Sequence, residues 1–335
     1  MKARAAVRVW GSLLFCGMFA ALGLSSAASL LRDAPAHPRW RVGHLFVTDT
    51  ASNRILTFPL ENGRAATTAD FVFSTCFSPL FLAMDAQPLL YVGCEDGTIN
   101  VYRHSRPDKW TLVRSLQPRD RFIGGPIAVD PDGVLFAVVG ELQDKIDVFA
   151  PGAYGSAAPV HQIPNFGPVA MAVDSLGVLY ASTANVTYSL VFLHPESEDH
   201  YDLEVMPTRF EEEYYGALTV DEQGRFWTRF EHGNEYSKWT AADFVQRDRL
   251  DPRQDRHFET RDCWGAGDSP GGWEEAGIFS MLVVGNYLYY TCIYGAYQWQ
   301  DAVFVYDIRN PGHEVAVESI APPTVGSPFG LAVGP

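Results

Sequence analysis

The sequence predicts an all-β chain assembled from repeated four-stranded units. The stretch PIAVDPDGVLFAV from Pro126 has close counterparts in PVAMAVDSLGVLYAS from Pro168 and GALTVDEQGRFWTRF from Gly216. In each copy an Asp-x-x-Gly link joins two short runs of β-branched and aromatic residues, which is typical of a β-hairpin. We expect the Asp to accept hydrogen bonds from turn amides and the Gly to supply the left-handed residue. A calcium-loop interpretation of DPDG fails, because no twelve-residue loop with a closing Glu follows.

The hairpins recur at a nearly constant period. Asp85, Asp130, Asp174 and Asp221 end equivalent apolar runs and are separated by 45, 44 and 47 residues. Each hairpin continues through a polar loop into a third strand, such as KIDVFAP from Lys145, and then into a less regular fourth strand. Four strands in about 45 residues are the signature of a β-propeller blade. A β-sandwich would not need repeats in this order.

The two ends of the repeated region complete one further unit. HLFVTDTASNRILTF from His44 supplies a second and a third strand without a first, and SPFGLAVGP from Ser327 supplies a first strand with nothing after it. Joining them closes the ring and removes the exposed sheet edges. The sequence therefore predicts one six-bladed β-propeller over residues 44–335, with four-stranded blades and the C-terminal strand beside His44–Asp49.

The N-terminus has the pattern of an export signal. Lys2, Arg4 and Arg8 precede an apolar run over 13–24, and small residues follow over 25–28. This run is too short for a membrane span, so residues 1–28 are predicted to be a cleaved secretory signal and 29–43 a lead-in. This signal predicts that the protein is secreted or periplasmic and does not insert into a membrane.

Charge narrows the classes of partner. The net charge of −15 becomes about −18 once the three cations of the signal are removed. Such an acidic protein is a poor candidate for binding nucleic acid and suits a neutral or cationic ligand, or a divalent metal. The same acidity is also explained by solubility alone.

Cysteine usage agrees with export. Cys16 is lost with the signal, which leaves Cys76, Cys94, Cys263 and Cys292. An even number predicts two disulfides, and spacing alone leaves three connectivities open. No zinc-ligand spacing is present. Asn185 begins the only Asn-x-Ser/Thr sequence, so glycosylation there is predicted if the source is eukaryotic.

The repeats resemble the NHL-repeat and SMP-30/gluconolactonase-like superfamily of six-bladed propellers over nearly the whole mature chain. The resemblance is carried by the P-x-A-V-D-x-x-G-x-L-[FY] units, by Thr50-Ala51-Ser52-Asn53-Arg54-Ile55, and by VFAPGAYGSAAPVHQI from Val148. These motifs specify architecture well and function poorly, because one propeller hosts many activities.

The resemblance implies that one face carries the loops entering each first strand and the loops between second and third strands. Cys76 and Cys94 then hold the same two repeat positions as Cys263 and Cys292, which implies the pairs Cys76–Cys94 and Cys263–Cys292. Each bridge would add about 3 kcal/mol by restricting the unfolded chain.

The same geometry places the candidate site at the fifth and sixth blades. Glu213 and Glu275 occupy equivalent entry positions and are the candidate catalytic carboxylates, with His232 as a candidate acid–base group in the neighbouring loop. Two converging carboxylates would shift one pKa upward or hold Ca²⁺ or another divalent cation, and no motif requires a cofactor. A solvated acidic rim is the alternative interpretation.

Aromatic residues gather in the same part of the chain. Such residues with a few polar groups typically line a ligand pocket. The candidate ligand-binding residues are Tyr215, Asn234, Trp273, Tyr294, Tyr297 and Trp299. Trp227, inside a predicted strand, is expected in the core.

Three functions remain open. The first is a secreted, monomeric propeller that binds a small molecule or an extracellular partner. The second is a metal-dependent lactone or ester hydrolase, as in gluconolactonase-like relatives, although the Glu-Gly-Pro opening of that family is replaced here by Ser327-Pro328-Phe329. The third is a metal-free condensing or cyclising enzyme similar to strictosidine synthase-like proteins.

Overall fold

The structure is a computed structural model, and its regular elements are strands. It describes residues 43–106, 109–120, 122, 125–140, 145–164, 167–183, 190–197, 200–205, 213–232, 242–247, 256–260, 279–293, 301–310, 314–321 and 323–335. Within these ranges the only helical element is a 3-10 turn at Thr50–Ser52. The predicted all-β class is confirmed. The predicted signal, and all of the predicted lead-in except Gly43, lie outside the described residues.

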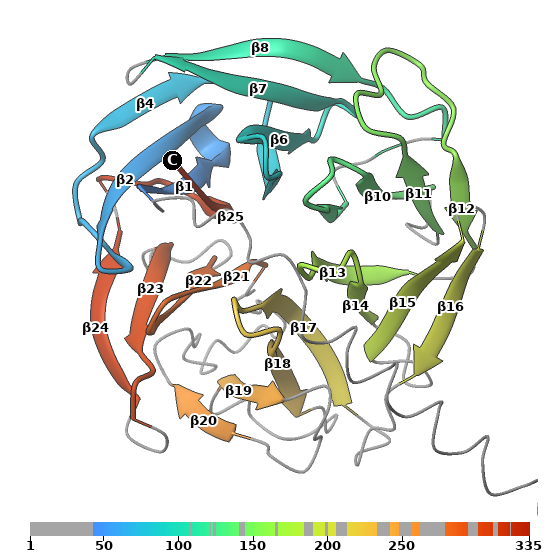
Figure 1. Cartoon of the computed structure of the whole chain (residues 1–335). Helices are drawn as coiled ribbons and strands as arrows, with labels where there is room; N and C mark the ends of the chain where they lie inside the picture. The colour runs from blue at the N-terminus through green and yellow to red at the C-terminus, as the bar shows by residue number, and fades with distance from the viewer. Residues whose placement is uncertain are drawn as a thin grey trace, which may run out of the picture. The chain divides into compact units, whose positions relative to one another are not determined.

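The strands within the described ranges form six antiparallel sheets (Figure 1). The first sheet contains β25 (Pro328–Gly334), β1 (His44–Asp49), β2 (Arg54–Glu61), β3 (Arg64–Ala65) and β4 (Phe71–Ser74). The second contains β5 (Pro79–Met84), β6 (Leu89–Cys94), β7 (Ile99–Arg106) and β8 (Lys109–Leu116). The third contains β9 (Ile127–Val129), β10 (Leu135–Val139), β11 (Lys145–Phe149) and β12 (His161–Ile163).

The remaining sheets repeat the four-stranded order. The fourth contains β13 (Pro168–Val173), β14 (Leu179–Thr183), β15 (Leu190–Ser197) and β16 (His200–Val205). The fifth contains β17 (Glu213–Val220), β18 (Phe226–His232), β19 (Ala242–Arg247) and β20 (Arg256–Thr260). The sixth contains β21 (Met281–Val284), β22 (Tyr287–Cys292), β23 (Ala302–Asp307) and β24 (Val315–Ile320).

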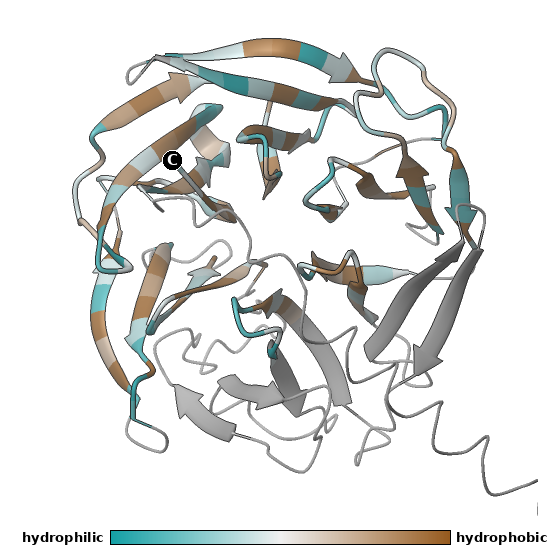
Figure 2. Ribbon diagram, viewed as in Figure 1, coloured by the Kyte–Doolittle hydropathy of each residue, from teal (hydrophilic) through white to brown (hydrophobic). Residues whose placement is uncertain are grey.

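The first strand of each sheet lies at one edge of that sheet. These first strands are β25, β5, β9, β13, β17 and β21. In Figure 1, β25, β13, β17 and β21 lie toward the middle, and β8, β12, β16, β20 and β24 lie at the periphery. The described first strands are mainly apolar, whereas β12 is hydrophilic (Figure 2).

The two ends of the repeated region meet in the first sheet, as predicted. β1 pairs with β25 in an antiparallel register that sets Leu45 opposite Val333 and Val47 opposite Leu331. The register shifts between Val47 and Asp49. The first sheet differs from the others by one element, because β3 adds a short strand beside β2.

The Asp-x-x-Gly links are tight turns between the first and second strands. Gly133, Gly177 and Gly224 have φ angles of 90°, 78° and 75°, in the left-handed region where a side chain is disfavoured. Their amides donate to the carbonyl oxygens of Asp130, Asp174 and Asp221, respectively. The turn interpretation is confirmed, and it places all these turns at the end of the first strands. We call the opposite end, where each first strand begins, the entry end.

The core consists of six apolar clusters between consecutive sheets. One joins the first and second sheets through residues such as Phe46 and Leu90, and another joins the fifth and sixth through Trp227 and Tyr290. A further cluster joins the sixth sheet to the first, where Tyr289 packs with Leu45 and Phe58. Trp227 is fully buried, which confirms its expected core position. Each fully buried Leu or Phe contributes about 1.5–3 kcal/mol, so these interfaces supply much of the stability.

Candidate functional site

A cavity of about 210 Å³ lies among the first strands. Every one of the six first strands, or the residue just before it, contributes to the lining: the segments are 81–84, 126–129, 170–173, 218–220, 279–282 and 331–333. Among these lining residues none carries an ionisable side chain, and only Thr219 and Ser280 have polar side chains. The cavity is therefore an uncharged space bounded by all six sheets.

Three phenylalanines frame the cavity at its entry end. Phe81 and Phe329 lie near the starts of β5 and β25, and Phe279 lies just before β21. The Phe329 ring packs edge-to-face on Phe81 at 5.0 Å between centroids and stacks on Phe279 at 4.2 Å. Phe279 lines the cavity and is also 37% exposed. We call Phe81, Phe279 and Phe329 the phenylalanine group.

Buried Thr48, at the end of β1, positions two members of this group. Its Oγ1 accepts hydrogen bonds from the amides of Phe329 and Gly330, at 3.2 and 2.7 Å. The same hydroxyl donates to the carbonyl oxygen of Leu80 at 3.3 Å. One side chain thus connects the start of β25 to the start of β5.

Buried Thr291, in β22, connects the start of β25 to the segment just before β21 in the same way. Its Oγ1 accepts from the amide of Ser280 and donates to the carbonyl oxygen of Phe329, at 3.0 and 3.1 Å. Ser280 Oγ in turn accepts from the amide of Leu331 at 3.2 Å. The backbone of Phe329 is therefore held on both sides, and the backbones of Leu80 and Ser280, next to Phe81 and Phe279, are each held by one of these threonines.

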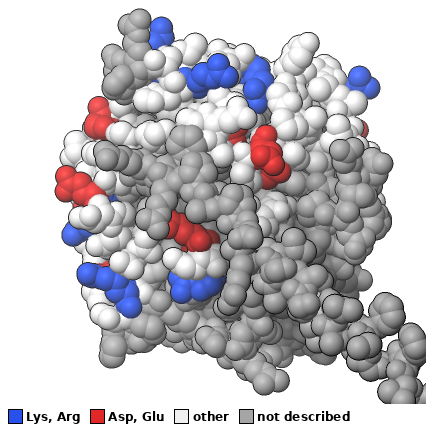
Figure 3. All heavy atoms as spheres, viewed as in Figure 1, with Lys and Arg blue, Asp and Glu red and all other residues white. Residues whose placement is uncertain are grey.

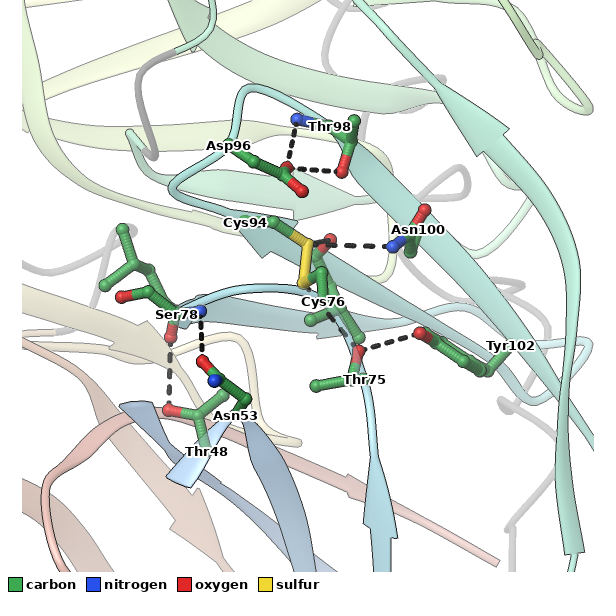
Figure 4. Close-up of a disulfide and its surroundings, with 12 residues drawn as sticks. Thr48, Asn53, Thr75, Cys76, Ser78, Cys94, Asp96, Thr98, Asn100 and Tyr102 are labelled. Atoms are coloured by element: carbon green, nitrogen blue, oxygen red, sulfur yellow. Dashed lines mark hydrogen bonds between the residues drawn. A yellow bond between two sulfur atoms is a disulfide. The ribbon is translucent and has the colours of Figure 1, made fainter. Parts of the chain in front are cut away.

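The entry end of the second sheet is covalently braced (Figure 4). Cys76, in the loop before β5, forms a disulfide with Cys94, the last residue of β6, and this pair is confirmed as predicted. Thr75 Oγ1 and Tyr102 Oη share a hydrogen bond of 2.7 Å beside it. Burial raises the pKa of Tyr102, so its hydroxyl stays protonated at neutral pH.

The short segment between Cys76 and β5 also contains a backbone conformation that is rare outside glycine. Ser78 has a φ of 47°, and Asn53, which faces it from the first sheet, has a φ of 54°. The Asn53 Oδ1 accepts the Ser78 amide at 2.7 Å (Figure 4). Asn tolerates the left-handed backbone region because its short side chain can form hydrogen bonds with backbone groups.

A buried ion pair completes the entry end of the first sheet. Asp49 is fully buried, and its Oδ2 accepts the Arg54 Nε at 2.8 Å. Its Oδ1 accepts the amide of Ser327 at 3.2 Å. Because both carboxylate oxygens are used, Asp49 serves to join β1 and β2 to the start of β25.

Two of the predicted catalytic residues face each other in the ladder. Glu213 begins β17 and His232 ends β18, and they are direct partners in the antiparallel register. Tyr215 pairs with Phe230 two positions further along. The entry end of the fifth sheet therefore brings a carboxylate position next to an imidazole position, as an acid–base pair would need.

The other predicted site residues lie outside the described residues. These are Asn185, Asn234, Cys263, Trp273, Glu275, Tyr294, Tyr297 and Trp299. Cys292 is disulfide-bonded, and its predicted partner Cys263 belongs to this set. The pairing Cys263–Cys292 therefore stays a prediction.

The phenylalanine group and its two threonines were not among the predicted site residues. A signal for part of the group exists, since Ser78-Pro79-Leu80-Phe81 and Ser327-Pro328-Phe329 both open a first strand. Thr48 and Thr291 carry no such signal, because they contact first strands that are distant in the sequence.

Charges are dispersed over the described surface. On the face shown in Figure 3, both Lys/Arg and Asp/Glu side chains occur across the described part. In the described ranges no three His, Cys, Asp or Glu side chains are grouped as metal ligands. None of the described residues forms a helix with the length and apolar character that a membrane span needs.

Comparisons with known proteins identify the fold class and no activity. No family model and no curated protein sequence matches the chain. A functionally unknown protein from Desulfotomaculum acetoxidans aligns with a TM-score of 0.52 at 9% identity, covering 87% of this chain and 99% of its own. A protein of unknown function from Bacteroides caccae aligns with a TM-score of 0.52 at 10% identity, covering 87% and 98%. At these identities the likeness concerns the fold alone.

Proposed function

We propose that the chain is a closed six-bladed β-propeller of the NHL-repeat and SMP-30-like kind. The six sheets, the clusters between consecutive sheets and the pairing of β1 with β25 support this architecture. In it each sheet is one blade, and the first strands surround the central axis.

We further propose that the protein is exported and binds a small molecule or an extracellular partner at the entry end, as a monomer. The observation that carries this proposal is the uncharged cavity whose mouth is framed by the phenylalanine group. An apolar cavity with a few convergent polar groups is the usual anatomy of a ligand site. The Cys76–Cys94 disulfide is compatible with an oxidising compartment.

The candidate carboxylates extend this site toward the fifth and sixth sheets. Leu218 of β17 lines the cavity, and Glu213 begins the same strand at the entry end. Glu275 precedes Phe279 by four residues in the sequence. We propose that a ligand seated at the mouth and extending toward the fifth sheet reaches the Glu213 position, and Glu275 stays a candidate from its place in the sequence.

The test is a ligand panel with three variants. Lactones, esters and Ca²⁺ are titrated calorimetrically into the wild type, Glu213→Gln, Glu275→Gln and the double variant. Binding or turnover should fall at least tenfold in the double variant, about 1.4 kcal/mol, while the melting temperature changes little. The matched control is Glu95→Gln, an exposed glutamate between β6 and β7 at the same end. Equal effects in the control and the double variant would contradict a role for Glu213 and Glu275.

A second candidate function is hydrolysis of a lactone or an ester. The register favours it, because it sets Glu213 and His232 at opposed backbone positions, and Glu and His are the residue types that commonly act as general acid and base. Turnover of a panel member should then be lost in both Glu213→Gln and His232→Gln, with a pH profile that reports the imidazole. Binding without turnover would leave the first proposal in place and dismiss this one.

A further inference from the structure

We infer that the cavity among the first strands selects a compact, uncharged ligand of about single-ring size and excludes charged molecules. This inference rests on the proposed binding role of the entry end and names the ligand class. It assigns recognition to the cavity walls and the phenylalanine group, which are distinct from the glutamates.

The first argument is the chemistry of the lining side chains. The described lining is made of Ala, Val, Leu, Ile, Met, Phe and Pro, with Thr219 and Ser280 as the only polar side chains. A charge brought into such a space would lose part of its hydration and find no counter-charge among these residues. Burying an unpaired charge is far more costly than burying an uncharged polar group. The overall acidity of the chain therefore does not make this cavity a cation site.

The second argument is the backbone. Each first strand is the terminal strand of its sheet, so one row of its N–H and C=O groups has no neighbouring strand to pair with. Some of these groups are met by side chains, as when Leu331 N–H donates to Ser280 Oγ. A ligand with its own donor and acceptor could satisfy others, since buried backbone groups need partners. A hydroxyl, carbonyl or amide on an apolar ring fits this requirement.

The third argument is size and access. A cavity of about 150 Å³ lined by apolar side chains is known to hold benzene. The present cavity of about 210 Å³ leaves room for one ring and a short substituent. Phe279 both lines the cavity and is exposed, which makes it the described side chain at the entrance. Because the backbones beside Phe279 and Phe329 are held by Thr291, this aromatic mouth is preorganised.

The experiment compares three probes of nearly equal size on the full mature chain. Benzyl alcohol is neutral, benzylamine is a cation at neutral pH, and benzoate is an anion. Binding is measured by NMR titration. We expect benzyl alcohol to bind at least tenfold more tightly than either charged probe. Benzylamine binding as tightly as benzyl alcohol, or benzyl alcohol failing to bind, would overturn the inference.

Variants locate the probe. Ala172 lines the cavity from β13 and is partly exposed, so Ala172→Met should fill the space and weaken benzyl alcohol binding at least tenfold. Leu176→Met is the control, because Leu176 is 53% exposed in the turn of the same hairpin. Phe279→Ala, which removes an exposed ring, should weaken binding about fivefold through lost aromatic contact. Unchanged binding in both Ala172→Met and Phe279→Ala would place the probe elsewhere and refute the site.

The outcomes separate this inference from the proposed function. Glu95→Gln and Leu176→Met should leave benzyl alcohol binding unchanged, because both residues are exposed and neither lines the described cavity. If benzyl alcohol binds and the panel of lactones and esters does not, the cavity inference stands and the proposed ligands are wrong. If panel members bind and depend on the glutamates while benzyl alcohol does not bind, the cavity inference is wrong and the proposed function stands.

Discussion

At the scale of single residues, the carboxylate of Asp147 is an incompletely satisfied polar group in the described core. This side chain is fully buried in β11, and its Oδ1 accepts Gln162 Nε2 at 2.7 Å. Among the described residues its Oδ2 has no hydrogen-bond partner. Burial, with a contribution from the charge of Asp120, raises the pKa of Asp147. The ionised form is therefore disfavoured in the folded protein.

The raised pKa of Asp147 determines how this residue makes the stability of the folded protein depend on pH. Because the folded pKa lies above the unfolded value of about 3.9, the folded state binds more protons between the two values. The contribution of Asp147 to stability is fully present below the unfolded pKa and is lost as the pH rises through the folded pKa. Asp147→Asn removes this loss and should gain about 1 kcal/mol over the wild type at pH 7, with no gain near pH 3.

Thermal unfolding from pH 3 to 8 measures this difference. The matched control is Asp120→Asn, whose carboxylate accepts the Lys145 Nζ, and this hydrogen bond lowers the pKa of Asp120. Its contribution has the opposite sign, since stability is lost as the pH falls through the folded pKa. A destabilisation by Asp147→Asn that grows as the pH rises would show instead that the folded protein stabilises the ionised carboxylate.

At the scale of elements, the aspartate that follows a first strand is tied to an aromatic residue six positions later. Asp85 Oδ2 accepts Tyr91 Oη, Asp174 Oδ2 accepts Tyr180 Oη, and Asp221 Oδ2 accepts Trp227 Nε1, at 3.2, 2.9 and 3.1 Å. In each turn Oδ1 accepts two backbone amides. The aspartate thus fixes both the turn and the second strand.

This arrangement predicts the cost of removing one hydroxyl. Tyr180→Phe takes the donor from the buried Asp174 Oδ2 and should lower the free energy of unfolding by about 1–3 kcal/mol. The third sheet provides the reverse experiment, since Phe136 stands six residues after Asp130. Phe136→Tyr should introduce the hydroxyl that donates to the aspartate in the other sheets. This hydrogen bond should offset part of the rise that burial causes in the pKa of Asp130. Chemical denaturation of both variants is the measurement, and no loss in Tyr180→Phe would mean that the pair is energetically neutral.

At the scale of the whole molecule, the first and second sheets approach so closely that a glycine is required. A Cβ added to Gly330 in β25 would lie 2.3 Å from the Leu80 carbonyl oxygen and 2.9 Å from the Leu82 nitrogen. Both are backbone atoms of β5, so no side chain can move aside. The same strand carries the pairing with β1 that joins the two ends of the chain.

Gly330→Ala should therefore destabilise the protein by about 2–3 kcal/mol through overpacking. Gly334→Ala is the control in the same strand, because its nearest neighbour, at 2.7 Å, is the terminal methyl of the flexible Met84 side chain. The control should cost less than half as much in urea unfolding. Equal costs would show that β25 can shift away from β5.

Much of the fold was predictable because its signals are local and repeated. The Asp-x-x-Gly turns specify hairpins within four residues, and the spacing of Asp85, Asp130, Asp174 and Asp221 specifies a unit of four strands. The incomplete units at His44 and Ser327 predicted their own pairing, which the register confirms. The Cys76–Cys94 bridge followed from repeat position, since both cysteines occupy the entry end of one sheet.

Only the tertiary structure assembled the mouth of the cavity. The hydroxyl of Thr48 reaches β5 and β25, which are 32 and about 281 residues away in the chain, and no local pattern encodes such a contact. Phe81, Phe279 and Phe329 each look like ordinary apolar residues at the start of a strand. They become one group because the first strands of three sheets begin side by side, and that adjacency exists only once the sheets have packed. A local sequence pattern can select a turn or a strand, whereas contacts between distant strands depend on the packing of the whole chain.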